Sequence, residues 1–447
     1  MRKIERRANI CLLLAACLFL GICVFVWRFV TQGSEWASFY GNQQIYTNGA
    51  INRGSIYDRD DVPLLECTTD GFIYNSDADI RRSTVSVVGD PNGNISTGAI
   101  NMWRDRLIGY DLLNGTYDTT ADGKKIDLTI DADANAAAYR ALAGRQGTVG
   151  VYNYETGEIL ALVNTPAIDP TQALPENEDS PVYFNTFLSG ALTPGSTFKL
   201  VTSAAAIDTV SSIDNFTNYC SGSVDVNGSP INCVNRQAHG ALNFESALAK
   251  SCNGAFGEIT RMVGADTMEE YVNRLGLTES LDVSGIETAK GSFNFPADDD
   301  NQLSWAGIGQ AQDLVNPCSL MVYMGAIANG GEAINPYLIK SSNILKKIAG
   351  GESLGDYLSQ ETADRLASMM KNNVQTTYGE SNFAGLDIYA KSGTAETGSG
   401  TPDAWFVGFI RNEDHPYAFV VWIKNGGTGY QVAGPVARAT LNALVQQ

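Results

Sequence analysis

The chain has 447 residues, of which 44% are hydrophobic, and a formal net charge of −19 at pH 7. This length and composition indicate a globular protein of roughly two or three domains. The acidic balance argues against nucleic acid as a partner, because phosphate backbones are bound by clusters of Lys and Arg. The two histidines, His239 and His415, lie far apart and without a Cys-x-x-Cys sequence, so we expect no metal site and no cofactor.

The N-terminal residues have the pattern of a membrane anchor. Basic residues in 1–7 precede an uncharged run from Ala8 to Trp27, and Arg28 ends that run. As a helix the uncharged run is about 30 Å long, which matches the hydrocarbon core of a bilayer. We therefore predict a cytoplasmic tail (1–7), a single transmembrane helix (8–28) and an extracytoplasmic catalytic domain, because basic residues stay on the cytoplasmic side.

A cleaved signal peptide is the alternative interpretation of this segment. Leu14-Ala-Ala-Cys17 resembles the cleavage box of a lipoprotein. The sequence stays apolar from Leu18 to Trp27, however, whereas the apolar region of a signal peptide is about 7–15 residues long. The uncleaved, single-pass anchor in the cell membrane is therefore preferred.

Residues 34–128 are predicted to form a small α/β domain. The stretches 51–60 and 71–74 suggest strands and tight turns, and the region lacks the residue types of a catalytic site. We interpret it as a pedestal, a dimerisation-like or partner-binding domain. Residues 129–447 are then a second, larger domain.

The larger domain begins with a hairpin, continues with helices and ends with strands. In chain order the predicted elements are a helix over 132–142, a hairpin over 147–164, helices over 317–329 and 360–374, strands over 387–396, 403–410 and 417–424, and a closing helix over 435–445. The early hairpin can join the late strands in one sheet. We therefore predict an α+β fold, with an antiparallel sheet of about five strands covered by helices.

Two cysteines flank a further predicted hairpin. Cys220 and Cys233 enclose a short segment with an Asn227-Gly228 turn. An extracytoplasmic location permits a disulfide between them. A disulfide and two separate buried thiols are both compatible with the sequence.

The stretch Pro194-Gly-Ser-Thr-Phe-Lys199 suggests a nucleophile beside a base. Pro-Gly breaks the preceding segment, and the apolar run 200–207 predicts a buried helix, so Ser196 is expected in its first turn. Residues three apart share a helix face, so Lys199 can accept the proton of Ser196. A lysine becomes such a base when burial or a second cation lowers its pKa. A second Ser-x-x-Lys, Ser368 to Lys371, has no break before it and is interpreted as surface helix.

Two more motifs follow the first in order, Ser251-x-Asn253 and Lys391-Ser-Gly-Thr394. Ser251 can relay a proton toward a leaving nitrogen, and Asn253 can hold Lys199 and the substrate amide. Lys391 supplies positive charge for a substrate carboxylate and helps to lower the pKa of Lys199.

The residues after Lys391 are predicted to bind substrate. Ser392 and Thr394 donate hydroxyl hydrogen bonds to the carboxylate, and Gly393 leaves room for substrate along the strand. The backbone N–H groups of Ser196 and Thr394 are expected to form an oxyanion hole. The ordered trio is the one found in class A β-lactamases and penicillin-binding proteins.

At these residues the chain resembles a class B penicillin-binding protein, a monofunctional peptidoglycan D,D-transpeptidase. The motifs that carry the resemblance are Thr193–Lys199, His239-Gly240, Ser251–Asn253, Ala328–Gly331, Lys391–Glu396 and Trp405–Phe409. The resemblance is strong over about 124–447, and Arg53–Arg59 resembles the opening motif of the pedestal domain. The chain departs from the family pattern in its short pedestal and in Asp61 and Ala311, where Gly is common.

The resemblance implies a penicillin-binding/β-lactamase-like transpeptidase domain and its reaction. Ser196 would be acylated by the D-Ala-D-Ala end of a peptidoglycan stem peptide, and an amine from a neighbouring strand would resolve the acyl-enzyme into a cross-link. β-Lactams would inhibit by trapping the same serine. Because no segment suits glycan polymerisation, the resemblance also implies a partner, a membrane glycosyltransferase of the shape, elongation, division and sporulation (SEDS) type.

Three alternatives use related machinery. A D,D-carboxypeptidase differs only in letting water reach the acyl-enzyme. A β-lactamase needs a deacylating Glu, which spacing does not identify here. A β-lactam-sensing receptor domain would acylate without turnover, but such receptors usually have more membrane spans and a cytoplasmic effector.

Overall fold

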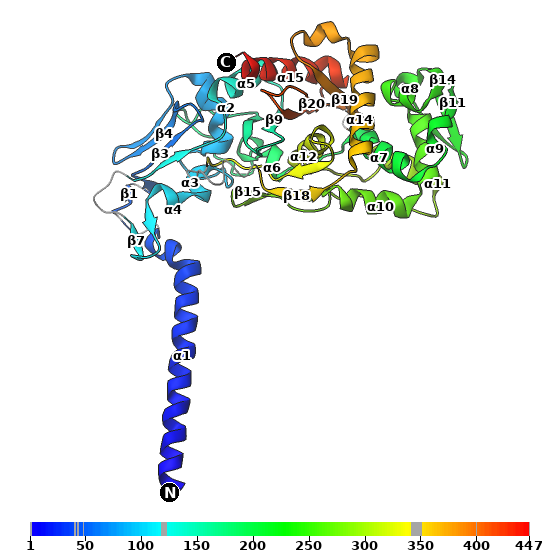
Figure 1. The fold of residues 1–447 in the computed structure, drawn as a ribbon. Coiled ribbons are helices and arrows are strands. Elements are labelled where there is room, and N and C mark those ends of the chain that lie inside the picture. Colours follow the sequence, from blue (N-terminus) through cyan, green and yellow to red (C-terminus); the bar gives the residue numbers. More distant parts are fainter. Residues whose placement is uncertain are drawn as a thin grey trace.

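One long helix stands away from a mixed α/β body (Figure 1). The computed structural model describes residues 2–39, 42, 44–47, 49–117, 123–340, 351–398 and 400–446. The long helix is α1 (Arg2–Ala37), and its apolar part is fully exposed. By length and composition α1 could cross a membrane. Its last turns pack against the hairpin of β6 (Tyr110–Asp111) and β7 (Thr116–Tyr117).

The N-terminal part of the body contains a four-stranded sheet in the order β5-β4-β3-β8. Its strands are β3 (Ser55–Tyr57), β4 (Pro63–Thr68), β5 (Gly71–Tyr74) and β8 (Lys125–Asp127). The first three are antiparallel and β8 is parallel to β3. The strands predicted in this region are therefore present.

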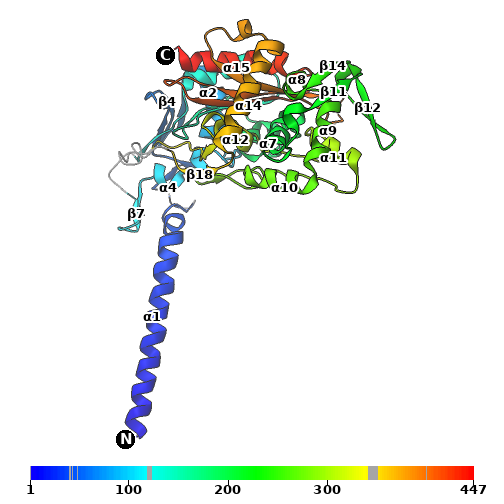
Figure 2. The ribbon, with the colours of Figure 1, turned by 45° about the vertical axis from the view of Figure 1, so that its right-hand side comes forward.

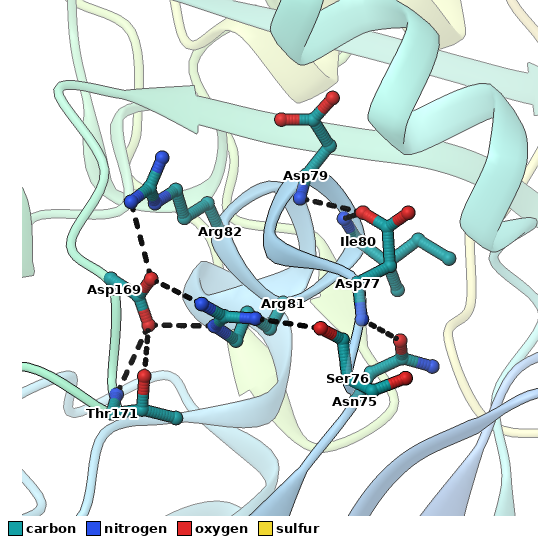
Figure 3. A network of polar contacts seen from close by, with 9 residues as sticks. All are labelled: Asn75, Ser76, Asp77, Asp79, Ile80, Arg81, Arg82, Asp169 and Thr171. Atoms are coloured by element: carbon teal, nitrogen blue, oxygen red, sulfur yellow. Dashed lines mark hydrogen bonds and ion pairs between the residues drawn. The ribbon is translucent and has the colours of Figure 1, made fainter.

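A bidentate ion pair joins this N-terminal part to the rest of the body (Figure 3). Arg81, on α2 (Ala78–Val88), donates two hydrogen bonds of 2.7 Å to the carboxylate of Asp169, and Arg82 lies 3.2 Å from the same group. Asp169 also accepts from Thr171. The Arg81 guanidinium holds the pKa of Asp169 well below its usual range. Because its carboxylate is 5% exposed, water screens this pair less than a surface pair.

The centre of the body is a five-stranded sheet in the order β10-β9-β21-β20-β19, antiparallel throughout. Its strands are β9 (Gly147–Asn153), β10 (Ile159–Thr165), β19 (Ile388–Ala395), β20 (Asp403–Ile410) and β21 (Tyr417–Ile423). The early hairpin pairs with the late strands, which confirms the predicted sheet. All eight residues of β20 are buried, because helices cover both faces of the sheet.

The two faces are covered by helices from distant parts of the chain. α5 (Ala132–Leu142) and α15 (Gly429–Val445) pack together on one face, and α12 (Pro317–Ala328) packs on the other (Figures 1 and 2). Asp131 accepts a hydrogen bond from Ala134 N and caps α5.

α15 begins six residues before the predicted helix start at Pro435. The prediction was wrong because proline usually opens a helix. Here the preceding residues pack, with Ala433 and Gly434 buried and the Tyr430 ring 5.0 Å from the Tyr378 ring.

A helical lobe lies beyond the β19 edge of the sheet, at the right of Figure 1. Its elements are α7 (Lys199–Thr209), β11 (Thr217–Cys220), β12 (Ser223–Val226), β13 (Ser229–Asn232), β14 (Gly240–Asn243), α8 (Phe244–Ala249), α9 (Asn253–Val263), α10 (Ala265–Arg274) and α11 (Asp300–Ala306). α14 (Gln360–Asn373) lies between this lobe and the sheet. The other elements of the described residues include β1 (Tyr46–Thr47), β2 (Ala50–Ile51), α3 (Ala99–Met102), α4 (Arg104–Leu107), α6 (Thr186–Ser189), β15 (Asp282–Val283), β16 (Ile286–Glu287), β17 (Glu332–Ile334) and β18 (Ser353–Asp356).

Candidate active site

Ser196 lies in a tight turn between the helical lobe and the edge strand β19. The turn is a 3-10 helix, Gly195–Thr197, that leads directly into α7, so Ser196 precedes the helix that was expected to contain it. Gly195 has φ +54°, and a Cβ there would lie 2.7 Å from Thr394 O. The missing side chain thus lets the turn lie against the strand.

Lys199 points back at Ser196 from the first residue of α7. Its Nζ lies 2.9 Å from Ser196 Oγ, 2.7 Å from Asn253 Oδ1 and 2.9 Å from Ser251 O. The side chain is fully buried and these acceptors are uncharged. Burial lowers the pKa of Lys199 to about 8. A neutral lysine beside a serine hydroxyl is therefore accessible near neutral pH.

Ser251 lies between the two lysines of the site. Lys391 Nζ donates to Ser251 Oγ over 3.0 Å, and Lys199 Nζ lies 3.3 Å from the same oxygen. Burial and then the charge of Lys199 hold the pKa of Lys391 well below its usual range. The sequence suggested burial or a second cation as the cause of a lowered pKa at Lys199, and burial is the largest cause.

β19 brings the three predicted substrate-binding residues alongside the serine turn. Ser392 and Thr394 are half-buried on this edge strand. Gly393 lies between them, and a Cβ there would come within 3.0 Å of Thr197, Pro194 O and Trp405. The substrate access that the sequence assigned to this glycine stays a prediction, and the contacts show that the missing side chain also makes room for the serine turn.

Two contacts of the site could not be expected from motifs. The Tyr378 hydroxyl donates to Ser392 Oγ (3.1 Å) and accepts from Ser392 N (2.8 Å). Asn253 Nδ2 donates to Asn232 O over 2.7 Å, so a hairpin residue orients the amide that contacts Lys199. Tyr378 ends a π-helical turn far along the chain, and no sequence signal marks it.

The structure thus brings together Ser196 of the serine turn, Lys199 of α7, Ser251 of the segment between α8 and α9, Asn253 of α9 and Lys391 of β19. A half-buried serine beside a buried lysine, a bridging hydroxyl and a second lysine make an active-serine site for acyl transfer. The roles of the individual residues, and of the N–H groups of Ser196 and Thr394, remain predictions.

Comparison with known proteins agrees with this class of site. Residues 147–442 match the penicillin binding protein transpeptidase domain family. The chain therefore belongs to this family, and the class B penicillin-binding protein predicted from the sequence is confirmed.

Several bacterial relatives are similar to most of the chain. The peptidoglycan D,D-transpeptidase PbpA of Mycolicibacterium smegmatis is 27% identical over 77% of this chain and 77% of its own length. Stage V sporulation protein D of Bacillus subtilis is 26% identical over 74% of this chain and 54% of its own length. The crystal structure of PBPA from Mycobacterium tuberculosis superposes with a TM-score of 0.76 at 25% identity, covering 88% of this chain and all of that one.

Proposed function

We propose that the protein is a peptidoglycan D,D-transpeptidase that cross-links stem peptides through an acyl-enzyme on Ser196. The observation that carries this proposal is the buried Lys199 amine 2.9 Å from Ser196 Oγ, with uncharged groups as its other partners. The names of the curated relatives support the peptidoglycan substrate. A structure of the M. tuberculosis relative has also been solved as a ceftriaxone acyl-enzyme complex, which supports the proposal that β-lactams inhibit this protein.

Acylation would use the groups around Ser196. Neutral Lys199 accepts the Ser196 proton while Oγ attacks the carbonyl carbon of the penultimate D-Ala. The N–H groups of Ser196 and Thr394 stabilise the oxyanion. The C–N bond to the terminal D-Ala then breaks, and Ser251 relays a proton to the leaving amine.

Substrate binding and deacylation would use the edge strand. Lys391, Ser392 and Thr394 hold the terminal carboxylate, while Asn253 holds Lys199 and the substrate amide. After the terminal D-Ala has left, an amine of a second stem peptide attacks the ester. The new amide is the cross-link, and the Ser196 hydroxyl is restored.

The long apolar helix α1 supports a proposal for where the protein lies. We propose that residues 8–28 span the cell membrane once, with 1–7 in the cytoplasm and the domains over 34–128 and 129–447 outside. A membrane glycosyltransferase of the SEDS type would supply the glycan strands, with the N-terminal domain as its docking module.

Intact-mass spectrometry of the full-length protein in detergent tests the proposal. We expect a lasting benzylpenicillin adduct on the wild type and on Ser368→Ala, and none on Ser196→Ala. An adduct on Ser196→Ala, or none on the folded wild type, would refute Ser196 as the nucleophile. An adduct that disappears while drug is consumed would indicate a β-lactamase, and D-Ala release without cross-linked product from paired stem peptides would indicate a carboxypeptidase.

A further inference from the structure

Four potential metal ligands converge beside the active site. Cys220, Cys233, His239 and Cys252 each offer one ligand atom, and these atoms all lie within 4.8 Å of one another. The Sγ atoms of Cys220 and Cys233 are 3.6 Å apart, and those of Cys233 and Cys252 are 3.7 Å apart. The Cys220 Sγ is 3.4 Å from His239 Nδ1.

The three separations of 3.4–3.7 Å are close to those in a tetrahedral zinc shell. Bonds of about 2.3 Å to sulfur and 2.0–2.1 Å to nitrogen place neighbouring ligands about 3.8 Å (S···S) and about 3.6 Å (S···N) apart. The Cys220–Cys233 separation is well beyond a disulfide bond of about 2.05 Å, and all eight cysteines are free in the structure. The disulfide that the sequence left open is therefore not formed here.

The surroundings suit thiolate ligands. The Gly222 N–H group donates to Cys220 Sγ over 3.4 Å, and Cys233 lies close to the backbone N–H groups of Asn253 and Gly254. The latter two N–H groups belong to the first turn of α9, where partial positive charge favours an anion. Such N–H···S contacts are the outer-shell support that metal thiolates use. The three cysteines are also buried, with Cys252 fully so.

A shared metal would stabilise the part of the fold that surrounds these four residues. The ligands come from the ends of β11, β13, β14 and α9, and the strands form only two-stranded ribbons, β11–β14 and β12–β13. An isolated ribbon of two strands is marginally stable in water. A metal shared by four ends would fix both ribbons to α9.

We propose that these four residues bind one structural Zn²⁺. Three thiolates and one imidazole in a closed tetrahedron favour zinc among divalent metals. The absence of a Cys-x-x-Cys sequence led to the expectation of no metal site. That argument does not cover ligands that are spread over four elements, because only the fold brings them together.

The site reaches the catalytic residues directly and so extends the proposed function, on which this part of the inference rests. Cys252 lies between Ser251 and Asn253, and Ser251 is held at φ +52°, a strained conformation for a non-glycine residue. Cys233 follows Asn232, whose carbonyl accepts from the Asn253 amide. The zinc therefore positions both motif residues that contact Lys199.

Metal content measured on the full-length protein tests the site. We expect one zinc per chain in wild type purified under reducing conditions without chelator, and loss of that zinc in Cys220→Ala and in His239→Ala. Cys318→Ala is the matched control, since Cys318 is fully buried outside the cluster and should keep the metal. If the ligand variants misfold, Co²⁺ added to chelated wild type should give thiolate charge-transfer and tetrahedral d–d absorption.

The possible outcomes distinguish a zinc site from a disulfide and from a cluster that binds no metal. Wild type that stays free of zinc after equilibration with Zn²⁺, or a Cys220–Cys233 or Cys233–Cys252 disulfide in its peptide map, would overturn the site. Chelation should slow benzylpenicillin acylation about 10–100-fold, and Zn²⁺ but not Mg²⁺ should restore it. Unchanged acylation without zinc would overturn the positioning role. Ser196→Ala should lose the adduct but keep the zinc, so failure of the catalytic proposal is distinguishable.

Discussion

Ser196–Lys199 and Ser368–Lys371 have the same spacing in the sequence and opposite surroundings in the fold. Lys199 is fully buried among uncharged acceptors, one of which is Ser196 Oγ. Lys371, on α14, lies 2.8 Å from the carboxylate of Asp387 and 3.6 Å from that of Glu380. Ser368 is exposed on the same helix.

The difference shows that reactivity comes from the environment of a lysine and not from the motif. Burial lowers the pKa of Lys199 to about 8. Burial also acts to lower the pKa of Lys371, but the hydrogen bond and charge of Asp387 outweigh it and raise that pKa. One amine can release its proton near neutral pH and the other keeps it.

Replacing each lysine by alanine should give the largest difference between the two motifs in acylation rate. Lys199→Ala should slow benzylpenicillin acylation by about 10²–10⁴-fold, because a general base is removed. Lys371→Ala should change acylation little and cost at most about 1 kcal/mol of stability, the value of a surface ion pair. Stopped-flow or quench-flow acylation rates and urea unfolding measure the two effects. Equal acylation losses in both variants would contradict the distinction.

The serine turn packs against β19, whereas Ser368 lies on the surface of α14 without such a contact. The substitution Gly393→Ala tests the contribution of this contact. A methyl group within 3.0 Å of Thr197, Pro194 and Trp405 should destabilise the protein by about 1–3 kcal/mol and slow acylation. Gly434→Ala is the control, because its Cβ would lie 3.5 Å from Phe383 in ordinary contact. Denaturant midpoints should fall only for the first variant. No change in Gly393→Ala would mean that the turn is free to move.

The pH dependence of acylation should report Lys199 and not Lys371. A lysine base acts in its neutral form, which is populated above its pKa. With a pKa of about 8, the neutral fraction of Lys199 and the acylation rate should rise about tenfold from pH 7 to pH 9. Single-turnover rates, corrected for spontaneous drug hydrolysis, measure this. A rate that falls over the same range would exclude neutral Lys199 as the base.

The smallest expected effect concerns the support of β19. Tyr378→Phe removes the hydroxyl that contacts Ser392 N and Oγ, a loss of about 1 kcal/mol, which corresponds to about fivefold in acylation. Thermal stability should remain close to that of wild type, because the ring stays packed on Phe406. A loss of acylation as large as that of Lys199→Ala would instead place the Tyr378 hydroxyl in the chemistry.

Local patterns were enough to predict the central sheet and the residues gathered at the site. The sequence predicted the hairpin of β9 and β10, and the Pro-Gly break marked the serine turn. Side-chain spacing on a helix face correctly placed Lys199 beside Ser196.

Contacts between distant segments could not be predicted in this way. Tyr378 reaches Ser392 only because α14 ends beside β19. Gly393 meets the serine turn only once two segments about 200 residues apart are packed together. The cluster around Cys233 likewise depends on how the ribbons dock on α9, since no ligand pair has a recognisable spacing. Sequence motifs report local chemistry, whereas these contacts are set by tertiary packing.

The long helix α1 continues without a break into turns that pack against the body. Its 36 residues extend about 54 Å, whereas a hydrocarbon core takes up about 30 Å. At its far end Gly33 lies against the Tyr110 hydroxyl, so that the helix and the body meet in a packed joint. With the anchor in a bilayer, as proposed, α1 acts as a lever arm rather than a tether. A small tilt of the anchor would then move the whole body, and Ser196 with it, along an arc about the membrane-spanning segment.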